Sequence, residues 1–199
     1  MKIYFDGCSY TFGAELINLI DERYSKLVAN HFGAGDYNIA RGGGSNRRII
    51  RNLLSHNMSE FDMVVIQMTY RWRTEFYKDG RWKRIRHFKT PSGFSHSKQK
   101  FVEEKGTRFI DDYGQSQHPY LKDIYSDEFG EIDEKIMYHA IKNILKDKKH
   151  FIFTIQHGTV LPIYAYNDPI HLRATQGHPN KEGHKFLADI VIRGLTTPK

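Results

Sequence analysis

Cysteine is almost missing from this sequence. Cys8 is the single cysteine among 199 residues, so no disulfide can form within the chain. Long apolar runs are missing too, because the run that begins at Ile3 ends at Asp6. A signal peptide needs about 7–15 apolar residues and a membrane helix about 20. We therefore expect a cytoplasmic protein without a signal peptide and without a membrane as partner.

Patterns typical of cofactor and metal sites are also missing. The glycine run 42–44 lacks the Gly-Lys-Ser/Thr ending of a phosphate-binding loop and the spacing of a dinucleotide fingerprint, so a helix N-cap at Ser45 or Asn46 is the better interpretation. The chain has eleven histidines, but those of its second half lack a cysteine or carboxylate at zinc-ligand spacing. We expect no cofactor and no metal.

The chain has the length and charge of one basic domain. A length of 199 residues is enough for a single domain with a full core, spanning 1–199. Thirty Lys and Arg against 23 Asp and Glu give a net charge of +7, which permits an anionic partner such as nucleic acid or an acidic glycan. Charge of this size does not by itself favour nucleic acid over other partners.

Short apolar runs alternate with segments of helical periodicity. Strands are predicted at 2–5, 37–40, 63–68 and 150–156, and helices at 14–32, from about 46, at 131–147 and at 180–196. The run 63–68 is continuously apolar, as in strands that parallel sheets bury on both faces. The fold class is therefore α/β, a three-layer α/β/α sandwich around a small parallel sheet.

The span at about 70–130 interrupts this alternation. It is rich in Arg, Lys and aromatic residues, and residues 78–81 read as the turn of a hairpin. We interpret it as an insertion after the third strand that covers the ligand-binding edge of the sheet. Its aromatic and basic side chains, with Arg71, Trp72, Arg73 and Trp82 as candidates, suit the stacking of sugars or bases and the binding of anions. The alternative is an ordinary solvated hairpin.

Four polar segments meet at one rim if the sheet is parallel. They are residues 7–9, the loop 42–46, the segment 69–71 and residues 177–180 before the last helix. Acyl transfer by a nucleophile needs a hydroxyl, a base and donors for the oxyanion, and this rim offers candidates for each. Ser9 by itself would also be explained as a turn residue that caps a helix.

The first two of these segments resemble the SGNH hydrolases, also called GDSL esterases and lipases. Residues 6–13, Asp-Gly-Cys-Ser-Tyr-Thr-Phe-Gly, are similar to the family's first block, with Ser9 as nucleophile and Cys8 where an aspartate often stands. Residues 38–43, Asn-Ile-Ala-Arg-Gly-Gly, are similar to the second block, which makes the Gly43 N–H an oxyanion donor beside that of Ser9. The resemblance implies the flavodoxin-like SGNH fold and a serine esterase.

The late histidine completes the resemblance. Residues 178–184, which run into Ala188, are similar to the family's fifth block and give His178 the role of base. The rival is His171, which has Asp168 three residues before it but lacks the glycine and closing helix that follow His178.

Two family positions are occupied by other residues. The side-chain oxyanion donor of the third block, an asparagine, is missing from residues 69–72, and Asn46, Arg71 or Arg73 are the candidate replacements. The acid three residues before the histidine is replaced by Thr175. Thr175 itself, Gln176 and Asp168 are the candidates for the missing acid's role.

The expected function is therefore ester hydrolysis. Small acyl esters such as O-acetyl groups, carried by a small molecule or a glycan, fit an aromatic and basic insertion better than long acyl chains do. The alternative is a catalytically degenerate SGNH-like module that binds an anionic polymer. The two replaced positions, at Thr175 and within 69–72, keep that alternative open.

Overall fold

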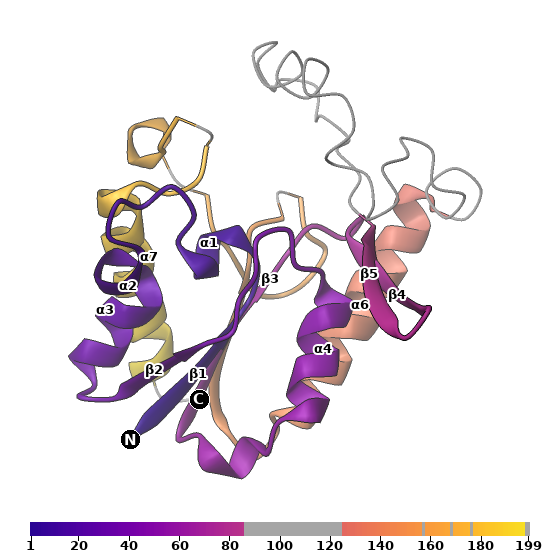
Figure 1. The fold of residues 1–199 in the computed structure, drawn as a ribbon, viewed down its shortest axis with the longest axis horizontal. Helices are drawn as coiled ribbons and strands as arrows, with labels where there is room; N and C mark the ends of the chain where they lie inside the picture. Colours follow the sequence, from indigo (N-terminus) through magenta and orange to yellow (C-terminus); the bar gives the residue numbers. More distant parts are fainter. Residues whose placement is uncertain (86–124, 157, 168, 176, 198–199) are drawn as a thin grey trace.

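The centre of the protein is a parallel five-stranded sheet. The computed structural model describes residues 1–85, 125–156, 158–167, 169–175 and 177–197 (Figure 1). The strand order is β2-β1-β3-β6-β7, all neighbours parallel. The strands are β1 (Lys2–Asp6), β2 (Gly35–Asn38), β3 (Met63–Met68), β6 (Lys149–Thr154) and β7 (Tyr164–Ala165). Because β6 and β7 are the fourth and fifth strands of this sheet along the chain, its order is the flavodoxin-like 2-1-3-4-5, as expected.

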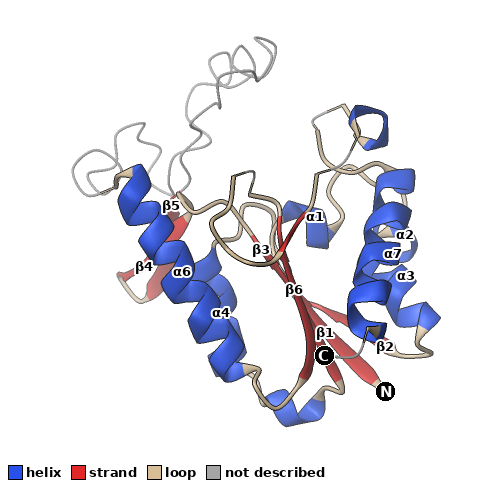
Figure 2. Cartoon of the chain, turned by 180° about the vertical axis from the view of Figure 1, so that it is seen from behind, coloured by secondary structure: helices blue, strands red, loops and turns tan. Residues whose placement is uncertain are grey.

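Helices cover both faces of the sheet (Figure 2). One layer holds α2 (Leu19–Glu22), α3 (Tyr24–His31) and α7 (Lys181–Thr196). The other holds α4 (Asn46–Ser55) and α6 (Asp127–Ile144). Short 3-10 turns, η1 (Met58–Glu60) and η3 (Ile170–Leu172), lie in the connections. The three-layer α/β/α sandwich is confirmed.

Strand β3 shows why both faces are covered. Val64, Ile66 and Met68 belong to the core cluster with α4 and α6, whereas Met63 and Val65 belong to the cluster with α3 and α7. Alternate side chains of a strand point to opposite faces, so a strand that is apolar at all positions but Gln67 needs a helix layer on each face. In the part of the chain that the structure describes, no helix combines the length and apolar character needed to cross a membrane.

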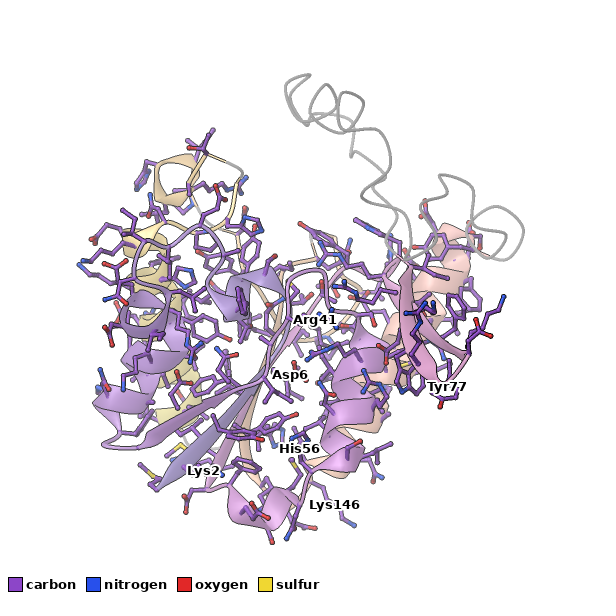
Figure 3. The ribbon with its side chains drawn as sticks, in the orientation of Figure 1. Lys2, Asp6, Arg41, His56, Tyr77 and Lys146 are labelled. Atoms are coloured by element: carbon purple, nitrogen blue, oxygen red, sulfur yellow. The ribbon has the colours of Figure 1, made fainter. Side chains whose placement is uncertain are left out.

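Strand β1 ends in a buried carboxylate. Asp6 is fully buried and accepts hydrogen bonds from Arg48 Nη1, Asn52 Nδ2 and the Gly7 N–H, each at 2.8 Å. Burial raises the pKa of Asp6 although these donors act in the opposite direction. Figure 3 places Asp6 on the α4 side of the sheet, below Arg41 of the loop between β2 and α4. The contacts fix the end of β1 to α4.

The helix predicted at 14–32 is instead two short helices, α2 and α3, preceded by α1 (Ser9–Phe12). Helix α1 ends where Gly13 adopts φ 90°, and Glu15 follows with φ 73°. After α2, Arg23 is extended at φ −67° and ψ 144° before α3 begins. The expectation was wrong because two left-handed residues and one extended residue interrupt the hydrogen-bond ladder of a helix.

The predicted hairpin is confirmed in the described part of the insertion. Strands β4 (Thr74–Lys78) and β5 (Arg81–Ile85) pair antiparallel, with Lys78 opposite Arg81. The two turn residues, Asp79 and Gly80, have φ 53° and 75°, as a tight hairpin turn of this twist requires. Tyr77 lies at the outer part of the hairpin (Figure 3). Residues 86–124 of the expected insertion lie outside the described residues, and its last residues, from Asp127, form the start of α6.

Candidate active site

The candidate nucleophile lies where the strand connections diverge. The chain leaves β1 toward α3 on one face, whereas β2 connects to α4 on the other (Figure 1). In open α/β sheets the crevice at such a switch point, outside the carboxyl ends of the strands, is where ligands bind. Ser9 is the third residue after β1, and Thr69 directly follows the neighbouring strand β3.

Buried polar contacts hold the turn that carries Ser9. Gln67 of β3 accepts hydrogen bonds from the Cys8 N–H at 3.2 Å and from Thr11 Oγ1 at 2.9 Å. A Cβ on Gly7 would collide with Thr11 Oγ1 and would stand 2.8 Å from Gln67 Oε1, so only glycine fits there. Ser9 is 8% exposed, and its Oγ lies 3.8 Å from Cys8 Sγ. The serine is thus placed by β1 and β3 together.

The glycine loop that carries Gly43 packs against this turn. The Arg41 N–H donates to the Gly7 carbonyl at 3.4 Å, and Gly43 adopts φ 69°. Ser45 then caps α4 by accepting from the Arg48 N–H at 3.2 Å, which confirms the predicted N-cap. The structure therefore brings the loop of the candidate oxyanion donor Gly43 to the turn that carries Ser9.

Asn46 joins the glycine loop to the exit of β3. Its Oδ1 accepts from the Thr69 N–H at 2.8 Å, and its Nδ2 donates to the Thr69 carbonyl at 3.2 Å. These two bonds use the amide oxygen and one of the two Nδ2 protons, and among the described residues the other proton can take an oxyanion role. Asn46 also aligns two of the loops that meet at the site.

The two candidate arginines have different partners. Arg71 Nη1 binds Glu131 Oε1 of α6 at 3.0 Å. Arg73 Nη1 donates to Thr69 Oγ1 at 2.8 Å, and its guanidinium lies 4.7 Å from the centre of the Tyr70 ring. These contacts direct Arg71 toward α6 and keep Arg73 at the exit of β3.

The charge of Arg73 acts on the residue beside Ser9. Burial raises the pKa of the Cys8 thiol, but the positive charge of Arg73 and hydrogen bonds to the sulfur outweigh burial and lower this pKa overall. The charge of Arg73 therefore acts on the turn that carries Ser9.

His178 is bound to the segment that follows Ser9. Its Nδ1 lies 2.7 Å from Glu15 Oε2, and its backbone N–H donates to the same oxygen at 3.1 Å. Tyr10, next to Ser9, donates from its hydroxyl to the Gly177 carbonyl at 3.2 Å and packs its ring against that of His178, with centroids 5.7 Å apart. The structure thus brings His178, the predicted base, to the segment that begins with the predicted nucleophile Ser9.

Glu15 is a site residue that the sequence reasoning missed. It was hidden in the helix predicted at 14–32, and it stands at no position that the family resemblance marks. Of the expected supports of His178, Thr175 is exposed, and Asp168 and Gln176 lie outside the described residues. A usable signal was Gly13, two residues earlier, because a glycine near a helix end often marks a left-handed break.

His171 and the tryptophans have other surroundings. His171 lies in η3, where its carbonyl accepts from Asn180 Nδ2 at 2.9 Å. Trp72 stacks on Tyr70 at the exit of β3, with ring centroids 4.7 Å apart. Trp82 lies on the hairpin, with the Arg51 guanidinium of α4 4.7 Å from its ring centre. Trp72 therefore lies beside the end of β3, whereas Trp82 lies on the hairpin against α4.

Comparisons with known proteins show the fold. No protein-family model matches the chain, and no curated protein matches it in sequence. Among solved structures, a protein assigned to the lipolytic G-D-S-L family from Desulfitobacterium hafniense is 10% identical with a TM-score of 0.52, over 97% of this chain and 98% of the other. A family two carbohydrate esterase from Clostridium thermocellum, in complex with cellohexaose, is 13% identical with a TM-score of 0.51, over 96% of this chain and 62% of the other.

A further carbohydrate esterase, whose active site has divergent catalytic and non-catalytic binding functions, is 14% identical with a TM-score of 0.53 over 100% of this chain and 65% of its own. The strand order, the site segments and these three similarities agree with one another. The chain therefore has the SGNH-hydrolase-like fold that its sequence blocks imply.

Proposed function

We propose that the protein is a serine ester hydrolase with Ser9 as nucleophile and His178 as base. The observation that carries the proposal is the attachment of the His178 loop to the residues that follow Ser9, through the Tyr10 hydroxyl and Glu15. Two candidates from opposite ends of the chain are thereby held at one sheet edge. The esterases among the structural neighbours support the same reaction class.

The reaction runs in two halves. Ser9 Oγ attacks the ester carbonyl carbon while His178 Nε2 takes its proton, and the carbonyl electrons move onto oxygen. When the tetrahedral intermediate collapses, the C–O bond to the alcohol breaks and the alcohol leaves with the proton from His178. Water then attacks the acyl-enzyme, gives a proton to His178, and releases the acid as Ser9 regains its proton.

Donors for the oxyanion come from three segments. The N–H groups of Ser9 and Gly43 supply two, as the sequence blocks imply. Asn46 or Arg73 supplies a third in place of the family's asparagine, since both lie at the exit of β3. Removal of one such donor typically costs about 100- to 1000-fold in kcat.

The proposed substrates are small acyl esters, such as O-acetyl groups, on a carbohydrate. Trp72, which stacks on Tyr70 at the exit of β3, is an aromatic side chain of the kind that sugars pack against. Two of the structural neighbours are carbohydrate esterases, which supports the same class. The comparison of p-nitrophenyl acetate with p-nitrophenyl octanoate, and acetate release from acetylated xylan, test this choice. A preference for octanoate would contradict it.

Active-site labelling tests the reaction itself. A fluorophosphonate is expected to modify Ser9, identified by mass spectrometry of the peptide, and both labelling and p-nitrophenyl acetate hydrolysis are expected to vanish in Ser9→Ala. Ser55→Ala is the matched control, because Ser55 is exposed at the end of α4 and donates to the Arg51 carbonyl at 2.7 Å. Its labelling is expected to equal that of the unmodified sequence.

The rival is a module that binds an anionic polymer and catalyses nothing. Several cations around the hairpin are engaged within the protein: Arg51 binds Glu75, Arg84 binds the Gly42 carbonyl, and Lys83 is 3% exposed. Cations used in this way are poorly placed to bind phosphates or acidic sugars, which supports the hydrolase. Absence of labelling and hydrolysis, with salt-sensitive binding of DNA or an acidic glycan, would favour the rival.

A further inference from the structure

One carboxylate oxygen contacts His178 twice. Glu15 Oε2 lies 2.7 Å from Nδ1 of the ring and 3.1 Å from the backbone nitrogen. The side chains of His178 and Glu15 are only 23% and 14% exposed, so the contact is partly shielded from water. We propose that Glu15 replaces the missing acid before His178 and acts as the positioning residue of the base. This inference rests on the proposed function.

The course of the chain after Ser9 makes this contact feasible. Helix α1 ends after one turn, with the N–H groups of Gly13 and Ala14 both donating to the Ser9 carbonyl at 3.0 Å. Glu15 then adopts φ 73°, which side-chain-bearing residues rarely do. A residue held in this way at a candidate site is evidence for a function that needs it. This change of chain direction after α1 turns the Glu15 carboxylate toward His178.

The histidine loop is shaped from its own side as well. Gly177 has φ 83°, and the His178 carbonyl accepts from the Ala174 N–H at 2.7 Å. The Tyr10 hydroxyl donates to the Gly177 carbonyl, so the loop is held by one residue of α1 and by Glu15 after it. The nucleophile and the proposed carboxylate thus come from one short segment, whereas the family resemblance places the acid beside the histidine.

The role follows from the chemistry of imidazole. With Nδ1–H donating to Glu15 Oε2, the lone pair lies on Nε2, where it can take the Ser9 proton. The carboxylate also stabilises the imidazolium that forms during the attack. Glu15 does not itself bind substrate in this scheme, and its effect passes through His178.

Glu15→Gln tests the role by kinetics. Because an amide lacks the charge and offers no equivalent hold on the Nδ1–H tautomer, kcat for p-nitrophenyl acetate is expected to fall by about 10³- to 10⁴-fold, with KM nearly unchanged. The acidic limb of the kcat/KM profile is expected to move to lower pH, since loss of a negative neighbour disfavours the charged imidazole. Glu15→Asp is expected to recover part of the loss.

Glu22→Gln is the matched control. Glu22 also joins the N-terminal segment to the C-terminal one, through Lys181 at 2.8 Å, but this contact does not involve His178. Its kcat and pH profile are expected to match those of the unmodified sequence. Equal kcat and equal pH profiles for Glu15→Gln, with Ser9 still labelled, would overturn the role of Glu15 and leave the hydrolase standing.

A measurement on the unmodified protein tests the role of Glu15 even if Glu15→Gln does not fold. Nitrogen-15 NMR of the imidazole in the unmodified protein reports which ring nitrogen of His178 carries the proton. The Nδ1–H form is expected, and an Nε2–H form at neutral pH would overturn the proposal. Because this result does not depend on turnover, it separates the failure of the Glu15 contact from failure of labelling at Ser9.

Discussion

Gly44 lies directly against the carbonyl oxygen of Gly7. A Cβ built on Gly44 would stand 2.8 Å from that oxygen and 3.1 Å from the Arg41 carbonyl. The two glycines come from the turns after β1 and β2, which carry Ser9 and Gly43. This backbone contact therefore sets the spacing between the candidate nucleophile and the candidate oxyanion loop.

Gly44→Ala is expected to separate these two turns. Backbone oxygens cannot rotate away as a flexible side chain can, so we expect a loss of about 1–3 kcal/mol in the free energy of unfolding, as for overpacked sites. A fall in kcat should accompany it, because the oxyanion donors shift. Urea unfolding and p-nitrophenyl acetate hydrolysis measure the two effects.

Gly42→Ala is the control for that substitution. A Cβ on Gly42 would meet no atom within 4 Å, and Gly42 has no positive φ. Its unfolding free energy should stay within about 0.5 kcal/mol of the unmodified sequence, as for most surface changes. Equal losses for the two variants would show that the close approach of Gly44 has no special role.

Arg48→Ala is expected to be strongly destabilising because it strands the Asp6 carboxylate. Asp6 is fully buried and Arg48 is 12% exposed, and the pair is 2.8 Å apart. Removal of one partner of a buried pair typically costs about 3–5 kcal/mol. Arg47→Ala removes a pair with Asp133 in which the Arg47 side chain is 43% exposed, and it is expected to cost less than about 1 kcal/mol. Urea unfolding of both variants measures the two losses. Similar losses for Arg48→Ala and Arg47→Ala would contradict the importance of the contact between Arg48 and Asp6.

The parallel sheet could be predicted because burial dominates its sequence. The run 63–68 is buried at every position, and its short length and its β-branched residues favour a strand buried on both faces over a helix. The hairpin turn at Asp79 and Gly80 was predictable for a similar local reason, since few residue pairs adopt two positive φ values. Strand β7, with two residues, is too short to leave a pattern.

The segment after Ser9 could not be predicted by periodicity. Apolar residues at helical spacing suggested one buried face, yet Ile20 of that set is 65% exposed, whereas Tyr24 and Val28 are buried. The spacing therefore reflects the core only in the part that forms α3. The pairing of Glu15 with His178 joins the two ends of the chain, and such contacts have no local sequence signature. The motif blocks identified Ser9, Gly43 and His178 as candidates, but the residues that orient them emerge only from tertiary structure.

Arg73→Gln tests which arginine serves the oxyanion. Because Arg73 Nη1 is held by Thr69 Oγ1 at the exit of β3, where the family's asparagine donor would stand, we expect a loss of about 100- to 1000-fold in kcat for p-nitrophenyl acetate. Arg71→Gln is expected to lose less than about tenfold, since Arg71 binds Glu131 of α6. The reverse order of effects would assign the oxyanion role to Arg71, and no effect of either would favour Asn46.

His184 is expected to make the protein sensitive to mild acid. It is fully buried on α7, and its Nδ1 accepts from the Tyr24 N–H at 3.2 Å. Burial, and secondly the charge of His178, lower its pKa from 6.5 to about 4, while Glu22 acts in the opposite direction. Above pH 6.5 both the folded and the unfolded states hold a neutral imidazole. Between pH 6.5 and 4 only the unfolded chain binds the proton, so the free energy of unfolding decreases as the pH is lowered through this window. Below pH 4 both states bind the proton, and His184 causes no further loss.

His184→Asn removes the titrating group while its amide oxygen can still accept from the Tyr24 N–H. At pH 5 the unmodified sequence should have lost about 2 kcal/mol through His184 relative to pH 7, at 1.36 kcal/mol per pH unit below 6.5. The asparagine variant lacks this contribution, so the difference between its urea unfolding free energies at pH 7 and pH 5 should be smaller by about that amount. If both proteins lose the same stability between these pH values, His184 is not the source of the acid sensitivity, because every other titrating group is shared by the two proteins.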